Sequence, residues 1–206
     1  MKTSAHPERC FPRRLALAQR LHCVPGMTNT LMVLMLAVNL LSMKASAVEP
    51  GVRLDANVLS SSGEPVQLAS LWGKPVLFFY ESPDTSKLNQ PAKEELKRLA
   101  DHYQLKKLVD TIAVANLEGL DWWPARPIAF GVVRGEEAKA QLPILVDLNG
   151  ALRKGPWKLD PKTPTVMVIS PGGEVLFQAS GKLEGERLEA LKSTLRQLLT
   201  TLASAQ

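Results

Sequence analysis

The short segment Ser82–Ser86 holds the side chains best suited to chemistry, with three hydroxyls and one carboxyl among five residues. A serine at the N-terminus of a helix gains some stabilisation of negative charge from the helix dipole and the free N–H groups. As a nucleophile it still needs a base, and His102 is the only histidine in residues 48–206. In a helix that begins near Ser86, His102 would lie about 24 Å away, too far to accept the proton. We therefore interpret the polar residues of this segment as a helix cap.

Thiol chemistry is excluded from most of the chain, because both cysteines, Cys10 and Cys23, lie in the first 47 residues. Disulfide exchange, peroxide reduction and thiolate metal binding all need an ionisable cysteine. A zinc or copper site is also disfavoured, since a single histidine would leave carboxylates to hold a metal that prefers softer ligands. The acidic residues show no spacing typical of metal ligands. The sequence predicts no metal and no cofactor.

Two neighbouring tryptophans, Trp122 and Trp123, form a second candidate site just before Pro124. Neighbouring side chains of a regular strand or helix cannot both point into one core, so at least one ring is expected at the surface. Exposed aromatic residues in irregular segments mark binding surfaces in many proteins. The alternative is that both rings pack over a loop and cover the edge of a sheet.

The elements that must position these residues follow from apolar runs and helical spacing. Short apolar runs bounded by turn residues predict five strands, at 76–80, 111–116, 144–146, 165–169 and 174–177. Apolar residues at helical spacing, with charged residues on the other face, predict two helices, at 91–102 and 184–202. Prolines and glycines leave 122–141 ambiguous, with only 136–141 favouring a helix. The order of elements predicts an α/β fold with a mixed central sheet flanked by helices.

The first 47 residues have the three parts of an export signal. Arginines such as Arg13 precede an apolar run at 31–41, and Ala45-Ser46-Ala47 follows with small residues at the positions that a signal peptidase reads. We predict cleavage after this triplet, which leaves one exported domain, 48–206, in the periplasm.

Two alternatives stay open for the N-terminal segment. Without cleavage, residues 27–43 would anchor the chain in the inner membrane, although a spanning helix needs roughly 20 apolar residues. Translation could also start at Met27 rather than Met1. Residues 1–47 hold six of the 25 basic side chains and one of the 20 acidic ones, so the remaining residues balance at 19 of each. A nucleic-acid partner is therefore not expected, because it would need a surplus of positive charge.

The order of elements resembles the thioredoxin and redoxin superfamily, whose fold has three layers. Alignment of Pro91 with the proline that kinks the first helix of that family places Pro83 and Ser86 where the two redox cysteines would stand. An alignment on the peroxiredoxin pattern puts Leu88 at the catalytic cysteine instead, again without a thiol. The resemblance also implies that the Thr163–Pro164 bond is cis and lies beside the turn at 83–86.

A closer resemblance is to the YtfJ-type family of exported bacterial proteins, described as thioredoxin-like, periplasmic and without redox cysteines. Short motifs carry it: Asp84-Thr85-Ser86 with Asn89 and Lys93, Phe130–Gly135, Leu145–Gly150 and Gly173–Phe177.

These resemblances imply an exported thioredoxin-fold protein that binds an envelope protein or peptide and has no catalytic activity of its own. In relatives that have cysteines, the cis-proline segment pairs with an extended substrate backbone, which requires no sulfur. The alternative is a redoxin-class thiol oxidoreductase or peroxidase whose thiol comes from a partner. The candidate binding residues line the former active-site cleft: Ser82, Pro83, Asp84, Thr85, Ser86, Thr163 and Pro164.

Overall fold

The computed structural model describes residues 52–103 and 107–204 of the chain. The chain divides into two compact units, Met1–Lys44 and Ala45–Gln206, and every described residue belongs to the second unit.

The predicted export signal at 1–47, its cleavage site and the alternative anchor at 27–43 lie outside the described residues. They stay predictions. In the part of the chain that the structure describes, every helix is too short or too polar to cross a bilayer.

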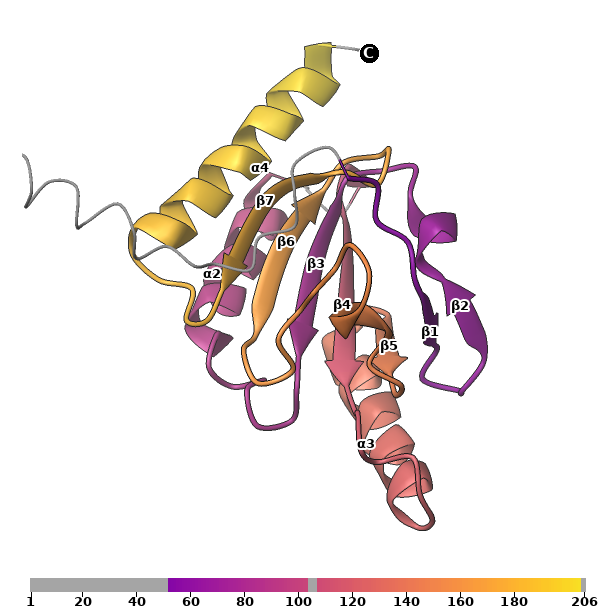
Figure 1. Ribbon diagram of the computed structural model, residues 1–206. Helices are drawn as coiled ribbons and strands as arrows, with labels where there is room; N and C mark the ends of the chain where they lie inside the picture. The colour runs from indigo at the N-terminus through magenta and orange to yellow at the C-terminus, as the bar shows by residue number, and fades with distance from the viewer. Residues whose placement is uncertain (1–51, 104–106, 205–206) are drawn as a thin grey trace, which may run out of the picture. The chain divides into compact units, whose positions relative to one another are not determined.

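The centre of the second unit is a seven-stranded mixed sheet with the strand order β2-β1-β5-β4-β3-β6-β7 (Figure 1). The strands are β1 (Asn57–Leu59), β2 (Pro65–Gln67), β3 (Val76–Glu81), β4 (Asp110–Asn116), β5 (Ile144–Asp147), β6 (Thr165–Ile169) and β7 (Val175–Ser180). Strands β3, β4 and β5 are parallel, and β6 pairs antiparallel with β3. The five predicted strands are confirmed, whereas β1 and β2, of three residues each, are too short for an apolar pattern to indicate.

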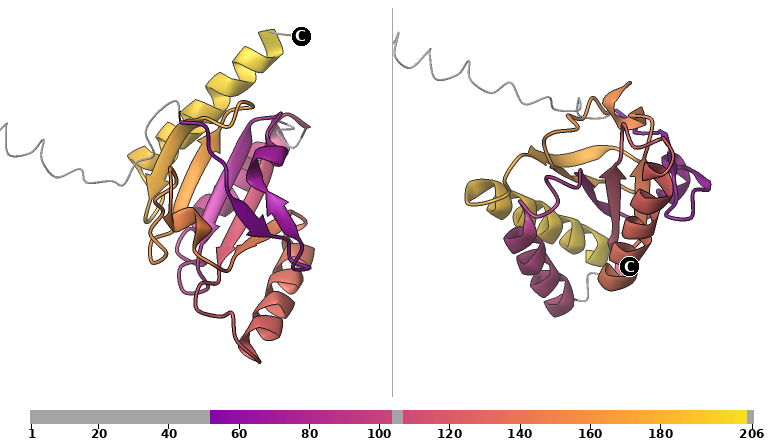
Figure 2. Two further views of the ribbon diagram at one scale, coloured as in Figure 1. Left: turned by 45° about the vertical axis from the view of Figure 1, so that its right-hand side comes forward. Right: turned by 90° about the horizontal axis from the view of Figure 1, so that it is seen from below.

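Three long helices cover one face of this sheet: α2 (Gln90–His102), α3 (Ala125–Ala140) and α4 (Glu186–Ser204). Helices α2 and α4 pack with Phe79 in one apolar cluster, and α3 packs with Val146 in another. Ala113 and Ala115 contact these two clusters respectively and lie two residues apart on β4, so both clusters lie on the same face. Figure 2 shows this helical layer from two further directions. Right-handed crossovers from β3 to β4 and from β4 to β5 place α2 and α3 on the same side.

The opposite face is covered by irregular segments and two short 3₁₀ helices, η1 (Leu68–Leu71) and η3 (Ala151–Arg153). Trp157 is fully buried there, with its ring centroid 5.2 Å from that of Phe78. Its indole N–H donates to the carbonyl of Asp55 at 2.9 Å, which satisfies the polar atom of the ring. The mixed sheet between these layers confirms the predicted α/β class.

Helix α3 is the main element that the sequence left ambiguous. Its N-cap is Pro124, and Pro127 lies in its first turn, where the backbone N–H groups have no intrahelical partner and proline is tolerated. Gly131 and Gly135 lie in the helix interior, where each costs about 1 kcal/mol relative to alanine. Burial of Phe130 against the sheet offsets this cost, so packing outweighs local propensity.

Tyr80 on β3 gives a prediction about the core. The residue is 1% exposed, and its hydroxyl has no hydrogen-bond partner among the described residues. Burial, with a further contribution from Asp147, raises the pKa of Tyr80 above its usual value, so the phenol stays neutral. We expect Tyr80→Phe to raise the free energy of unfolding by about 1 kcal/mol, because it removes a buried unsatisfied group. Urea unfolding measures this effect, and a clear loss of stability would mean that the hydroxyl has a bonding partner.

Candidate binding site at the carboxyl end of β3

The sheet brings the two candidate segments to the same edge. Strand β3 ends at Glu81, β6 begins at Thr165, and the antiparallel register pairs Tyr80 with Thr165. The turn Ser82–Ser86 and the segment Thr163–Pro164 therefore leave the sheet side by side. The proximity that the sequence resemblance implied follows from this register.

The prediction that the Thr163–Pro164 bond is cis is wrong, because the bond is trans. The cis bond that the described residues contain joins Trp123 to Pro124. A turn built on Asp160 sets the path before Pro164: the Thr163 amide donates to the Asp160 carbonyl at 3.2 Å, and the Thr163 hydroxyl donates to Oδ2 at 2.7 Å. Pro164 is buried, and its carbonyl accepts from the Gly181 amide at 2.8 Å.

This turn changes what Thr163 can do. Its amide is already bonded within the chain, so it does not present the free backbone donor that pairing with an extended peptide requires. The carboxylate of Asp160 also stabilises this turn. Hydrogen bonds from the Lys162 amide and the Thr163 hydroxyl lower the pKa of Asp160.

The turn at Ser82–Ser86 is closed on itself. The amide of Ser82 donates to Thr85 Oγ1 at 2.9 Å, and the hydroxyl of Ser86 donates to the Pro83 carbonyl at 3.0 Å. The amides of Thr85 and Ser86 both donate to the Ser82 carbonyl. The interpretation of this segment as a cap of α2 is wrong, because the cap residue of that helix is Asn89. Pro83 and Asp84 are exposed and form the tip of the turn.

Asn89 connects the start of α2 to the segment that follows β7, the last strand of the sheet. It is 1% exposed, its Nδ2 donates to the Gly181 carbonyl at 3.1 Å, and its Oδ1 accepts from the Leu183 amide at 2.7 Å. The sequence motif contained Asn89 without indicating this role. A buried asparagine that satisfies two backbone groups holds the turn and the β7–α4 connection together.

Lys93 and Glu81 form the main electrostatic contact of the site. Lys93 Nζ lies 2.5 Å from Glu81 Oε2, 3.1 Å from the Ser86 carbonyl and 5.8 Å from the centroid of the Phe79 ring. The two side chains are 28% and 12% exposed, and Glu81 Oε1 has no hydrogen-bond partner among the described residues. Burial raises the pKa of Glu81, and the Lys93 ammonium partly opposes this. The pair fastens α2 and the turn to the end of β3.

The geometry does not equip a hydroxyl at this site for nucleophilic catalysis. Ser86 donates to a backbone carbonyl, and His102 lies at the opposite end of α2, edge-on to Tyr103. Among the described residues, no group of three or more acidic, histidine or cysteine side chains is arranged to hold a metal ion.

Trp122 and Trp123 are 58% and 82% exposed. Of the two alternatives drawn from the sequence, the structure therefore favours a surface position over packing across a loop. The carbonyl of Trp122 accepts from the Arg126 amide at 2.9 Å, so the pair lies directly before the first turn of α3.

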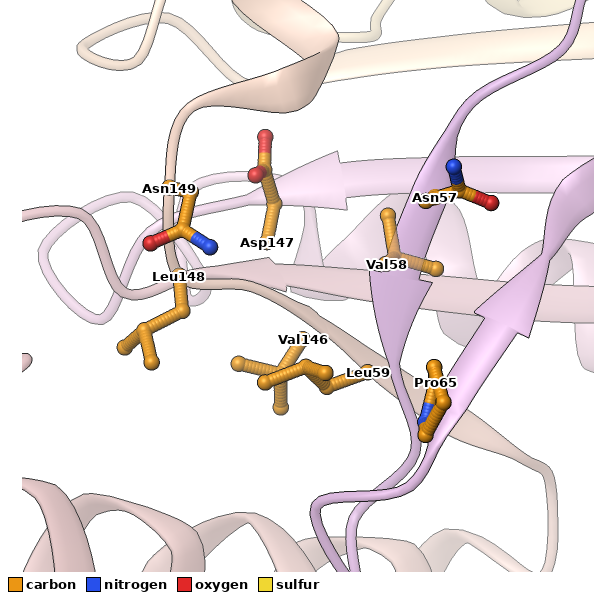
Figure 3. A pocket seen from close by; sticks show the side chains of 8 residues that line it. All are labelled: Asn57, Val58, Leu59, Pro65, Val146, Asp147, Leu148 and Asn149. Atoms are coloured by element: carbon orange, nitrogen blue, oxygen red, sulfur yellow. The ribbon is translucent and has the colours of Figure 1, made fainter.

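A cavity that the sequence did not indicate lies between β1, β2 and β5 (Figure 3). Its volume is about 130 Å³, and its lining residues are Asn57, Val58, Leu59, Pro65, Val146, Asp147, Leu148 and Asn149. Both oxygens of Asp147 are already used, because they accept from the amides of Ala151 and Leu152 at 2.7 and 3.0 Å. This volume suits roughly four water molecules and is below the usual size of a small-molecule site.

No family model matches the chain, and no curated protein matches it. Solved structures do share its fold. A protein of Chlorobium tepidum described as a thiol:disulfide interchange protein, DsbE, is 20% identical, with a TM-score of 0.50 over 74% of this chain and 99% of its own. A domain from Cytophaga hutchinsonii described as a possible thiol-disulfide isomerase is 15% identical, with a TM-score of 0.52 over 78% and 99%.

An uncharacterized conserved protein of Geobacillus kaustophilus is 14% identical, with a TM-score of 0.55 over 76% of this chain and 85% of its own. At these identities the likeness extends to the fold and no further. The chain therefore has the thioredoxin-like α/β fold that the resemblance of its sequence implied.

Proposed function

We propose that this chain is an exported thioredoxin-fold protein of the bacterial envelope that binds a protein or peptide partner and has no thiol catalysis. The observation that carries the proposal is the turn at Pro83 and Ser86. These residues stand where the resemblance expects two cysteines, and the Ser86 hydroxyl is engaged with the Pro83 carbonyl. A redoxin mechanism needs a thiolate at this place.

The export part of the proposal rests on the signal-like segment at 1–47 and on the resemblance to the YtfJ-type family. The binding part rests on the shape of the edge. Lys93, Asn89 and Asp160 each fix one side of it through hydrogen bonds, and they leave Pro83 and Asp84 exposed at its tip. Such preorganisation reduces the entropy lost on binding.

A photoreactive residue at position 84 tests this proposal in cells. We expect a discrete adduct with one envelope protein at position 84, and none with the same probe at Gln197, an exposed position on α4. Thr163→Lys should reduce the yield of that adduct severalfold, because it adds charge and bulk beside the tip. Equal labelling from positions 84 and 197, or an adduct indifferent to Thr163→Lys, would contradict binding at this edge.

A further inference from the structure

The cavity between β1 and β5 lies where the hydrogen-bonded ladder between these two strands stops. The strands are antiparallel, and a single pair, Leu59 with Val146, joins them. In an antiparallel ladder, hydrogen-bonded pairs recur every two residues along each strand. The next pair would be Asn57 with Leu148, but no backbone hydrogen bond joins these two residues. Both of them line the cavity of about 130 Å³, which therefore takes the place of the missing pair (Figure 3).

The backbone of Asn57 points into this cavity from β1. The carbonyl of Ala56 accepts from the Leu68 amide at 2.9 Å, and Val58 pairs with Val66 on β2. These groups therefore face β2, and a trans peptide bond directs its C=O and its N–H to opposite sides. The N–H and the C=O of Asn57 consequently face β5, and neither forms a hydrogen bond with a described residue.

A third backbone group, the N–H of Leu148, points into the cavity from the other side. The carbonyl of Asp147 accepts from the Leu117 amide at 3.0 Å and so faces β4. The N–H of Leu148 belongs to the same trans peptide, so it faces β1. Leu148 is 5% exposed, and its N–H has no hydrogen-bond partner among the described residues. Because buried N–H groups are rarely left unpaired, this one indicates a bound polar molecule.

The chemistry of the lining selects a neutral ligand that both donates and accepts. The side-chain amide of Asn149 also lines the cavity and bonds to no described residue, and Leu59 and Val146 supply apolar wall. An anion would meet the Asn57 carbonyl and the Asp147 carboxylate, whereas a cation would meet two N–H groups. A carboxamide carries a C=O and an N–H in one plane, so it satisfies both kinds of group.

We propose that this cavity binds a neutral carboxamide group, whose C=O accepts from the Leu148 N–H and whose N–H donates to the Asn57 carbonyl. The room for roughly four water molecules matches the four non-hydrogen atoms of acetamide. The group comes from an asparagine or glutamine side chain of a protein partner, or from a free small amide. This inference is independent of the proposed function, because no residue of the turn Ser82–Ser86 lines the cavity.

Three molecules of the same size and shape test the site in ¹⁵N-labelled protein purified from cells. Acetamide carries both groups, acetone lacks the N–H, and acetate is charged. We expect acetamide to shift the amide signals of Asn57 and Leu148 saturably, with a Kd on the order of 1 mM for so small a ligand. Acetone and acetate should bind at least tenfold more weakly, because they leave polar groups of the site unpaired. Shifts that do not saturate, or that are equal for the three molecules, would mean that the cavity holds only water and would overturn the proposal.

A variant and two peptides complete the test. Asn149→Ala should weaken acetamide binding severalfold, whereas Gln197→Ala, which removes an exposed amide on α4, should leave it unchanged. The tripeptide Ala-Gln-Ala with acetyl and methylamide ends should bind, and the matching Ala-Glu-Ala should bind at least tenfold more weakly. Tighter binding of the glutamine peptide than of acetamide supports the site with a protein side chain as its ligand, and equal binding supports it with a free amide. Equal binding of the two tripeptides, or an effect of Gln197→Ala as large as that of Asn149→Ala, would contradict recognition of a carboxamide here.

Discussion

Replacing Lys93 with methionine is expected to lower the free energy of unfolding at neutral pH by about 2–4 kcal/mol. The substitution keeps the apolar stem but leaves the largely buried Glu81 carboxylate without its cation. Loss of one partner from a fully buried pair costs more than this, and the 28% exposure of Lys93 reduces the effect. Urea unfolding followed by circular dichroism at pH 7 and pH 5 measures the difference.

The dependence on pH has a definite sign. Burial raises the pKa of Glu81 above its ordinary value of 4.5, and removal of Lys93 raises it further. The folded variant therefore binds a proton more strongly than the unfolded chain, and its stability falls as pH rises above 4.5 through the raised pKa. The deficit of the variant should shrink at pH 5.

Two variants control this result. Lys97→Met changes an exposed lysine of the same helix and should alter stability by less than about 0.5 kcal/mol. The double variant Glu81→Leu, Lys93→Met should recover much of the loss, because it removes the unpaired charge. If Lys93→Met costs no more than Lys97→Met, or if its deficit grows in acid, Glu81 is not held by Lys93 in the folded protein.

Asn89→Ala is expected to cost about 2–3 kcal/mol. Truncation leaves the Leu183 amide and the Gly181 carbonyl without their partner in a buried setting. Gln90→Ala is the matched control, because Gln90 is exposed and its side chain donates to the exposed Glu94, so a change below about 0.5 kcal/mol is expected. Denaturant unfolding of both variants decides the point, and a cost for Asn89→Ala as small as that of Gln90→Ala would refute the role of Asn89.

The sequence predicted those elements whose pattern depends on burial alone. The runs at 76–80 and 165–169 became the central strands β3 and β6, because continuous apolar residues suit a strand buried on both faces. Helix α4 followed from its leucine spacing. Helix α3 could not be predicted in full, since its prolines and glycines conceal a helix that is stabilised by packing against the sheet.

The candidate site was predicted only in outline. The register of β3 and β6 brings the predicted segments together, but the contacts that shape them are not local in the sequence. Lys93 reaches Glu81 across twelve residues, and Asn89 reaches Gly181 across ninety-two. The state of the bond before Pro164 also escaped prediction, because the expectation of a cis bond came from the family resemblance alone. Patterns of residue types do not specify such contacts.

We propose that the edge beside β3 binds its partner without sulfur. The most direct measurement places a photoreactive residue at position 84 and compares the adduct that it forms in two chains in cells. One is the parent chain, and the other is the Cys10→Ser, Cys23→Ser variant. Blotting confirms that equal amounts of the two are exported. We expect the same adduct at the same yield, because neither cysteine lies in residues 48–206. Loss of the adduct in the variant, or its release by a reducing agent, would contradict sulfur-free binding and point to thiol chemistry.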